Sequence, residues 1–200
     1  MTTLLQIKAS IFGDHGQSSQ LAERFVARWR KANPDGRVIV RDLAAKPVPH
    51  LTAARFQGFS AKPEERTPEQ VEATRESDEL IAELKEADVV VLGLPMYNFS
   101  LPSAFKAYID HVARVGITFR YTATGPEGLI GDKPVYVFAA RGGQYQGSDM
   151  DTQTPLVRMV LGFMGMKDVR FVFAEGLARS GGVAEKALSN AHVEIDSVEL

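Results

Sequence analysis

Residues 89–102, VVVLGLPMYNFSLP, decide the fold. The run 89–94 is apolar and rich in β-branched residues, and Pro95 ends it, which is typical of a buried parallel strand. An aromatic and amide segment, Met96–Ser100, follows, and Pro102 suits the first turn of a helix, where a missing N–H costs nothing. In an open α/β sheet, ligands bind beyond the carboxyl ends of the strands. We therefore expect residues 96–100 to face a ligand.

On both sides of this stretch, short apolar runs alternate with amphipathic segments. Strands are predicted at residues 3–9, 38–40, 89–94, 135–140 and 169–174. Helices are predicted from the Ser18-Ser19 pair to about residue 33, and at residues 67–87, 102–114, 155–163 and 180–197. Five strands that alternate with helices indicate a doubly wound parallel sheet. Because no GxGxxG follows the first strand, we predict an α/β fold of the flavodoxin-like order 2-1-3-4-5, with residues 1–200 as one domain.

Some local signals are more specific. Ser18 or Ser19 would cap the first helix. Thr67-Pro68-Glu69-Gln70 combines an N-cap, a proline at the first position and a glutamine three residues after the cap. The core contacts of the helix that begins there are predicted to be Val71, Leu80, Ile81 and Leu84. Residues 116–131 are predicted to form a small hairpin or lid with a turn at Gly125-Pro126. The proline-rich segment 44–66 reads as a functional flap with a short helix near residues 52–59.

Composition excludes several classes of function. The chain has 200 residues, a net charge of −2 and no cysteine. A nucleic-acid-binding protein would normally carry a basic face, which this charge does not suggest. No apolar run is long enough to cross a bilayer, and the N-terminus shows no targeting signal, so we expect a cytoplasmic protein. Without cysteine or histidines at metal-ligand spacing, we expect no metal site, and redox chemistry would need a bound cofactor.

The loops after the first, third and fourth strands would share one edge of the sheet. Residues 10–19 place hydroxyls beside a helix N-terminus, which suits a phosphate, although such serines often only cap a helix. Residues 96–99 offer flat apolar groups and backbone donors to a planar ring, or simply pack on the sheet. Residues 141–143 bring a guanidinium and two glycine amides to a ring edge, or form a plain turn. Together the three loops fit FMN.

The residues then show a resemblance. Pro95–Phe99, Arg141-Gly142-Gly143, Val112–Tyr121 and Phe171–Gly176 resemble the FMN-dependent NADH:quinone oxidoreductases known as azoreductases. The resemblance covers essentially the whole chain. It implies a homodimer with one non-covalent FMN per subunit at the dimer interface. It also implies two-step (ping-pong) reduction of quinones and azo bonds by NADH or NADPH.

The resemblance also assigns cofactor contacts. Carried over residue by residue, they are Ser10, Gln17, Ser18, Met96, Tyr97, Asn98, Phe99, Arg141, Gly142 and Gly143. Gly16 and Ala140 stand where relatives often have serine. Backbone N–H groups would have to replace those two hydroxyls.

The flavin would carry the chemistry, so no residue is assigned as a catalytic acid. The backbone N–H of Asn98 is the candidate partner for flavin N5, and the amides of Gly142 and Gly143 would stabilise the reduced ring. Phe99, Phe119 and Phe163 are the candidate apolar walls of the acceptor pocket.

Two other classes share this topology. A flavodoxin-type electron carrier usually has a strongly acidic surface, which a charge of −2 does not indicate. A phosphoacceptor signalling domain needs acidic residues at the end of its first strand, where this chain has Lys8-Ala9-Ser10. The oxidoreductase is therefore the preferred interpretation.

Overall fold

A computed structural model describes residues 2–200. Its centre is a parallel sheet of five strands in the order β2-β1-β3-β6-β7. The strands are Thr3–Lys8 (β1), Arg37–Asp42 (β2), Val89–Pro95 (β3), Val135–Ala140 (β6) and Val169–Ala174 (β7). Counting only these five strands, the order is 2-1-3-4-5. The predicted flavodoxin-like architecture is confirmed.

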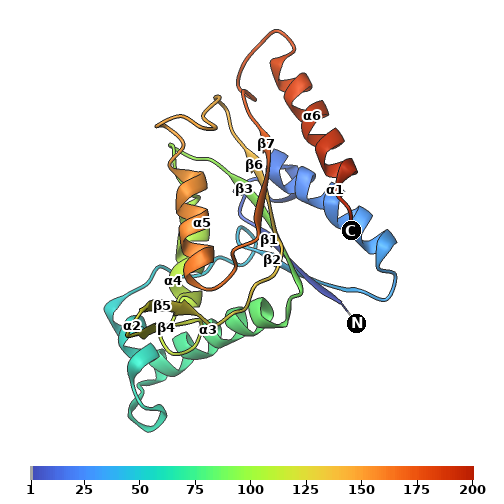
Figure 1. Cartoon of the computed structure of the whole chain (residues 1–200). Coiled ribbons are helices and arrows are strands. Elements are labelled where there is room, and N and C mark those ends of the chain that lie inside the picture. The colour runs from blue at the N-terminus through green and yellow to red at the C-terminus, as the bar shows by residue number, and fades with distance from the viewer. Residues whose placement is uncertain (1) are drawn as a thin grey trace.

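Helices cover both faces of the sheet (Figure 1). Gln17–Ala32 (α1) and Val183–Ser197 (α6) lie on one face, and Pro68–Glu86 (α3), Ser103–Val112 (α4) and Gln153–Phe163 (α5) lie on the other. Successive side chains of a strand point to opposite faces. In β1, Leu4 therefore joins the core under α1, while Leu5 joins the core under α3.

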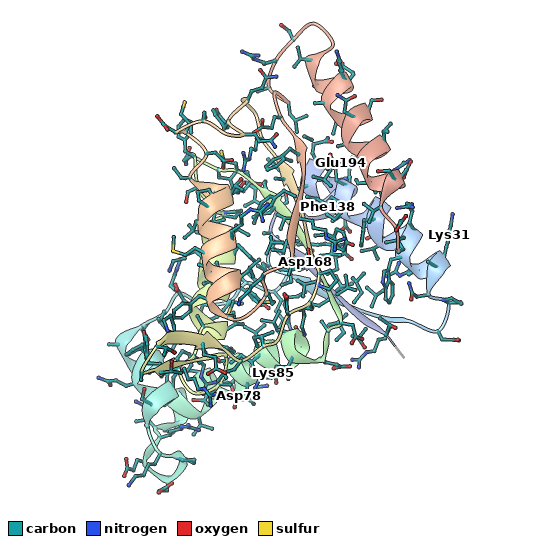
Figure 2. All side chains as sticks on the ribbon, in the orientation of Figure 1. Lys31, Asp78, Lys85, Phe138, Asp168 and Glu194 are labelled. Atoms are coloured by element: carbon teal, nitrogen blue, oxygen red, sulfur yellow. The ribbon has the colours of Figure 1, made fainter. Side chains whose placement is uncertain are left out.

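The core under α1 contains an aromatic contact. Phe138 of β6 packs against Phe25 of α1, with their ring centroids 5.4 Å apart. Figure 2 shows Phe138 between the sheet and α1, with Lys31 and Glu194 farther out on their helices. Both helices are thus held by apolar contacts on their inner sides.

Helix α3 begins as predicted. The Thr67 side chain accepts a hydrogen bond from the Gln70 N–H, and the Gln70 side chain accepts one from the Thr67 N–H. The predicted core contacts Leu80, Ile81 and Leu84 are buried. Val71 was predicted to join them, and this is wrong: it is 51% exposed because it lies beside the buried stripe of the helix.

Helix α1 begins at Gln17, and its N-cap is Gly16. The prediction that Ser18 or Ser19 caps this helix is therefore wrong. A single 3₁₀ turn, Gly13–His15 (η1), leads the chain into the helix before it reaches the serines, which lie buried in the first helical turn. The other helices start within a few residues of their predicted positions.

Residues 116–131 contain the predicted hairpin, made of Phe119–Thr122 (β4) and Gly125–Gly128 (β5). The prediction of a turn at Gly125-Pro126 is wrong, because these residues begin β5 and Pro126 pairs with Tyr121. The hairpin lies at the end of α5. A Cβ on Gly128 would overlap the backbone of Gly165, and the Ile130 N–H donates to the Met164 carbonyl at 3.0 Å.

The segment 44–66 contains one α-helix, Ala53–Ser60 (α2), capped by Thr52, and a 3₁₀ turn, Pro63–Glu65 (η2). Helix α2 packs on α3, and Arg55 forms an ion pair with Glu76 at 2.6 Å. Within residues 2–200, no helix is both long enough and apolar enough to span a bilayer.

Candidate functional site

Three loops meet at the carboxyl edge of the sheet. They follow β1, β3 and β6, which are neighbours: Lys8 pairs with Gly93, and Pro95 pairs with Ala140. The order of the strands therefore brings together residues 10–19, 96–101 and 141–152. The prediction that these three loops share one edge is confirmed.

The loop after β1 ends at the N-terminus of α1. Ser10 is buried, and its hydroxyl accepts a hydrogen bond from the Phe12 N–H at 3.2 Å and lies 3.4 Å from the Tyr97 hydroxyl. Gly16 is packed so closely that a Cβ there would overlap the Ser10 hydroxyl.

The first turn of α1 offers groups for an anion. Gln17 is exposed as the first helical residue. The Ser18 hydroxyl is buried and has no hydrogen-bond partner among the described residues. Helix N-terminal amides and an unpaired hydroxyl together suit a phosphate group.

The loop after β3 contains a tight turn at Tyr97–Ser100. The Tyr97 N–H donates to the Ser100 carbonyl at 3.2 Å, and the Ser100 N–H donates to the Tyr97 carbonyl at 3.0 Å. Asn98 and Phe99 have φ values of 49° and 63°, which match the two central positions of a type I′ turn. The N–H groups of Asn98 and Phe99 have no protein partner in residues 2–200. This turn therefore presents two backbone donors and the half-exposed Phe99 ring at the edge of the sheet.

Met96 and Ala140 lie at the base of the site. The Met96 N–H donates to the Ala140 carbonyl at 3.0 Å, which continues the pairing of β3 with β6 by one residue. Ala140 is buried, and Met96 is partly buried. Both residues lie at the points where their strands lead into the site loops.

The glycines after β6 are held through their carbonyl groups. The Gly142 carbonyl accepts from the Ala178 N–H at 3.1 Å, and the Gly143 carbonyl accepts from the Gly176 N–H at 2.8 Å. Their own N–H groups have no protein partner in the described chain. A Cβ on Gly143 would overlap the Tyr145 ring, so a larger residue there would displace that ring. This loop supplies two further backbone donors.

The Arg141 guanidinium does not reach the ring edge where we expected it. Its side chain is fully buried and bonds Asp151 at 2.9 Å and Glu175 at 3.0 Å. Burial raises the pKa of Asp151, but hydrogen bonds from Arg141 and Thr154 outweigh it and hold that pKa below its usual value. The physical reason for the inward orientation is that a buried cation needs charged partners, and these partners lie on two other segments.

Phe119 and Phe163 do not line one pocket with Phe99 within this chain. They pack on each other with ring centroids 4.4 Å apart, beside the hairpin. Phe163 ends α5, whose first residue, Gln153, bonds the Pro95 carbonyl at 2.9 Å. At 1.5 Å per helical residue, Phe163 lies about 15 Å along α5 from Gln153. The three aromatic candidates therefore fall at two ends of α5.

An apolar hollow of about 420 Å³ lies next to the hairpin. Aromatic side chains from two segments line it: Phe56, Phe59, Phe119 and Tyr121. Phe56 and Tyr121 are 60% and 72% exposed. A surface this rich in exposed aromatic side chains is typical of an interaction site.

Several residues that organise the site were missed in the sequence. Tyr145 packs its ring on Phe99 with the centroids 5.4 Å apart, and the Thr152 hydroxyl donates to the Phe99 carbonyl. Gln153 and Glu175 bind Arg141. Glu175 directly follows β7, so its place at the carboxyl edge is a signal that sequence reasoning had available. No cluster of metal-binding side chains occurs within residues 2–200.

Comparison with known proteins adds to this geometry. Residues 2–198 match the model of a family described as having a flavodoxin-like fold. A protein from Cellvibrio japonicus (strain Ueda107), named FMN-dependent NADH:quinone oxidoreductase, is 53% identical over 98% of each chain. This chain belongs to that oxidoreductase family.

This chain is also similar to solved structures of azoreductases. An azoreductase from Bacillus anthracis str. Sterne has a TM-score of 0.89 at 31% identity and covers 98% of this chain and 97% of its own. An FMN-dependent NADH-azoreductase from Bacillus anthracis str. Ames Ancestor, in complex with FMN, also has a TM-score of 0.89, at 26% identity, and covers 98% of this chain and 96% of its own.

Proposed function

We propose that this protein is an FMN-dependent enzyme that reduces quinones and azo compounds with electrons from NADH or NADPH. The observation that carries the proposal is the meeting of the loops after β1, β3 and β6 at one edge of the sheet. The names of its relatives support the same cofactor and chemistry.

The residues present fit FMN. The N-terminus of α1, with the unpaired Ser18 hydroxyl, suits the phosphate, and Ser10, Gly16 and Gln17 complete that loop. The Tyr97–Ser100 turn would place its backbone donors and Met96 against the ring. The amides of Gly142 and Gly143 would bind the carbonyl-bearing edge of the ring. Gly16 and Ala140 contribute backbone only.

The protein's part in the reaction is to bind and orient. When bound, FMN supplies two-electron transfer between nicotinamide and acceptor. The Asn98 N–H is the candidate donor to flavin N5, and the amides of Gly142 and Gly143 would favour the negatively charged reduced state because hydrogen bonds to a charge are stronger. A two-step (ping-pong) exchange follows if donor and acceptor use the same apolar space in turn.

A homodimer would explain the separated aromatic residues. Phe119 and Phe163 lie at the opposite end of α5 from Phe99, so they can wall a pocket beside the flavin only if they belong to a second copy. The exposed aromatic hollow near the hairpin is a surface that such a copy would cover. We propose that each subunit contributes this hollow to the partner's flavin site.

Turnover tests the proposed function against the flavodoxin-type carrier. We expect the purified protein to be yellow with FMN and to oxidise NADH or NADPH continuously when a quinone or an azo dye is added. A colourless protein that stays colourless with FMN overturns the proposal. A yellow protein without sustained turnover favours the carrier.

Tyr121→Glu tests the dimer. A carboxylate in the aromatic hollow should convert the protein to a monomer in sedimentation and abolish most turnover, because burying an unpaired charge is costly. Tyr136→Phe, on the opposite face of the sheet in the core under α1, is the control. A Tyr121→Glu protein that sediments like the wild type and retains its turnover contradicts the interface.

A further inference from the structure

Arg141 is the only fully buried arginine side chain with two carboxylate partners in the described chain. One of its terminal nitrogens binds Asp151 at 2.9 Å and the Thr154 hydroxyl at 2.8 Å, and the other binds Glu175 at 3.0 Å. The guanidinium lies 4.8 Å from the centre of the Phe173 ring. A planar fork with several donors meets all these partners at once, which a lysine ammonium cannot do.

Glu175 connects Arg141 to the loop after the two glycines. Its carboxylate accepts hydrogen bonds from the N–H groups of Tyr145 and Gln146, both at 3.0 Å. The same carboxylate binds Arg141. The backbone that follows Gly142 and Gly143 is therefore tied to the buried guanidinium.

Gln153 connects Arg141 to the loop after β3. Its side-chain oxygen accepts from Arg141 at 3.3 Å, and its side-chain nitrogen donates to the Pro95 carbonyl at 2.9 Å. Thr152, its neighbour, donates to the Phe99 carbonyl. Arg141 is thus connected through Gln153 to Pro95, just before the tight turn, and through the neighbouring Thr152 to Phe99 within the turn.

We propose that Arg141 is a positioning residue that acts through Glu175 and Gln153. It holds the Gly142 and Gly143 amides and the Tyr97–Ser100 turn in one arrangement, which binds reduced FMN more tightly than a relaxed site would. This inference rests on the proposed function. Reduced FMN gains most because its ring edge carries negative charge, and charge-assisted hydrogen bonds depend strongly on preset donors.

Arg141→Lys keeps the charge and removes the fork. In hydrogen exchange of the full-length protein without FMN, we expect faster exchange at residues 97–100 and 142–147. Exchange in the five strands of the sheet should not change. The Kd for reduced FMN should rise about tenfold more than the Kd for oxidised FMN. For a two-electron couple, this ratio corresponds to about 30 mV in reduction potential.

Arg170→Lys is the matched control. Arg170 also forms a forked ion pair, with Asp168, and lies 5.4 Å from the Tyr136 ring, but it sits at the opposite end of β7. This variant should change neither local exchange nor the ratio of the two Kd values. An Arg141→Lys protein that loses stability while both loops and the ratio stay unchanged overturns the proposal, because it would make Arg141 structural only.

If Arg141→Lys does not fold, Glu175→Gln takes its place in the exchange measurement. Its amide oxygen can still accept from Tyr145, Gln146 and Arg141, but the negative charge that pairs with the Arg141 guanidinium is lost. Faster exchange that reaches residues 97–100 supports the coupling, and a change confined to residues 145 and 146 overturns it. A wild-type protein that binds no FMN overturns the proposed function and the proposed preference for reduced FMN. Hydrogen exchange, measured without FMN, still tests whether Arg141 positions the two loops.

Discussion

At the scale of single residues, Asn98 and Phe99 hold the site's backbone in a left-handed conformation. Left-handed φ values cost about 1–2 kcal/mol for most L-residues and less for asparagine, whose side chain tolerates them. The turn keeps this conformation because Tyr97 and Ser100 close it with two hydrogen bonds and Tyr145 packs on Phe99. Strain of this kind is commonly found where a backbone must present donors to a ligand.

Substitution of Asn98 tests the backbone conformation of the turn while the N–H donor is kept. Asn98→Gly keeps the N–H and accepts a φ of 49°, so FMN affinity and stability should be close to wild type. Asn98→Ala keeps the N–H but should lower the free energy of unfolding by about 1 kcal/mol. Urea unfolding and FMN titration measure both. Equal stability of the two variants would contradict the strain. Asn98→Pro would remove the N–H donor, but it would also open the turn, because proline fixes φ at about −65°. It therefore cannot test the donor alone.

Gly16 leads to a second prediction at this scale. Gly16→Ala would push its Cβ into the Ser10 hydroxyl and displace the hydrogen bond to the Phe12 N–H. We expect a loss of about 1–3 kcal/mol in the free energy of unfolding, as for other overpacked sites, together with weaker FMN binding. Gly162→Ala is the control, since nothing lies within 4 Å of its added Cβ and alanine favours the helix. A Gly16→Ala protein as stable as wild type would show that Ser10 moves aside at no cost.

At the scale of elements, α3 shows how far local chemistry determines structure. Its cap residues, Thr67 and Gln70, bond each other's backbone as the sequence pattern requires. Thr67→Ala should lower the free energy of unfolding by about 1 kcal/mol, measured by urea unfolding. Ser180→Ala, at an exposed position, should have no effect. A loss in both variants alike would exclude a specific cap.

The sequence predicted the elements whose causes are local. Strands β3, β6 and β7 each consist of one mostly apolar run, and the proline and capping residues of α3 lie within residues 67–70. These signals could therefore be identified directly in the sequence. The start of α1 could not, because it depends on the 3₁₀ turn Gly13–His15, which brings Gly16 against Ser10 at the beginning of the helix.

The site divides in the same way. The three loops follow from strand order, which the alternating pattern predicts. The inward turn of Arg141 depends on Asp151 and Glu175, which are 10 and 34 residues away in the chain. No local pattern around residue 141 reports such distant partners. The separation of Phe119 and Phe163 from Phe99 likewise depends on the direction in which α5 runs.

At the scale of the whole molecule, His111 links stability to pH. It is fully buried on α4, with Nδ1 2.9 Å from the Ala107 carbonyl and Nε2 without a partner in the described chain. Burial lowers its pKa below the ordinary 6.5. The unfolded chain therefore binds a proton more readily than the folded protein does.

The free energy of unfolding should fall as pH decreases from 7 through 6.5 towards the lower folded-state pKa of His111. His111→Gln should flatten this dependence, because glutamine does not titrate. Denaturant unfolding at a series of pH values measures the slope. His50→Gln is the control, since His50 is exposed, and it should retain the wild-type slope. A His111→Gln protein with the wild-type slope would contradict the assignment.

The contact between Gly128 and Gly165 limits how the chain can vary. Backbone meets backbone there, with no side chain between them to shrink or bend. A movement of the β4–β5 hairpin, which carries Phe119 and Tyr121, would therefore also displace the backbone at Gly165, just after α5. If the enzyme evolves to use new acceptors, we expect substitutions in the hairpin at residues 121–124 and none at Gly128.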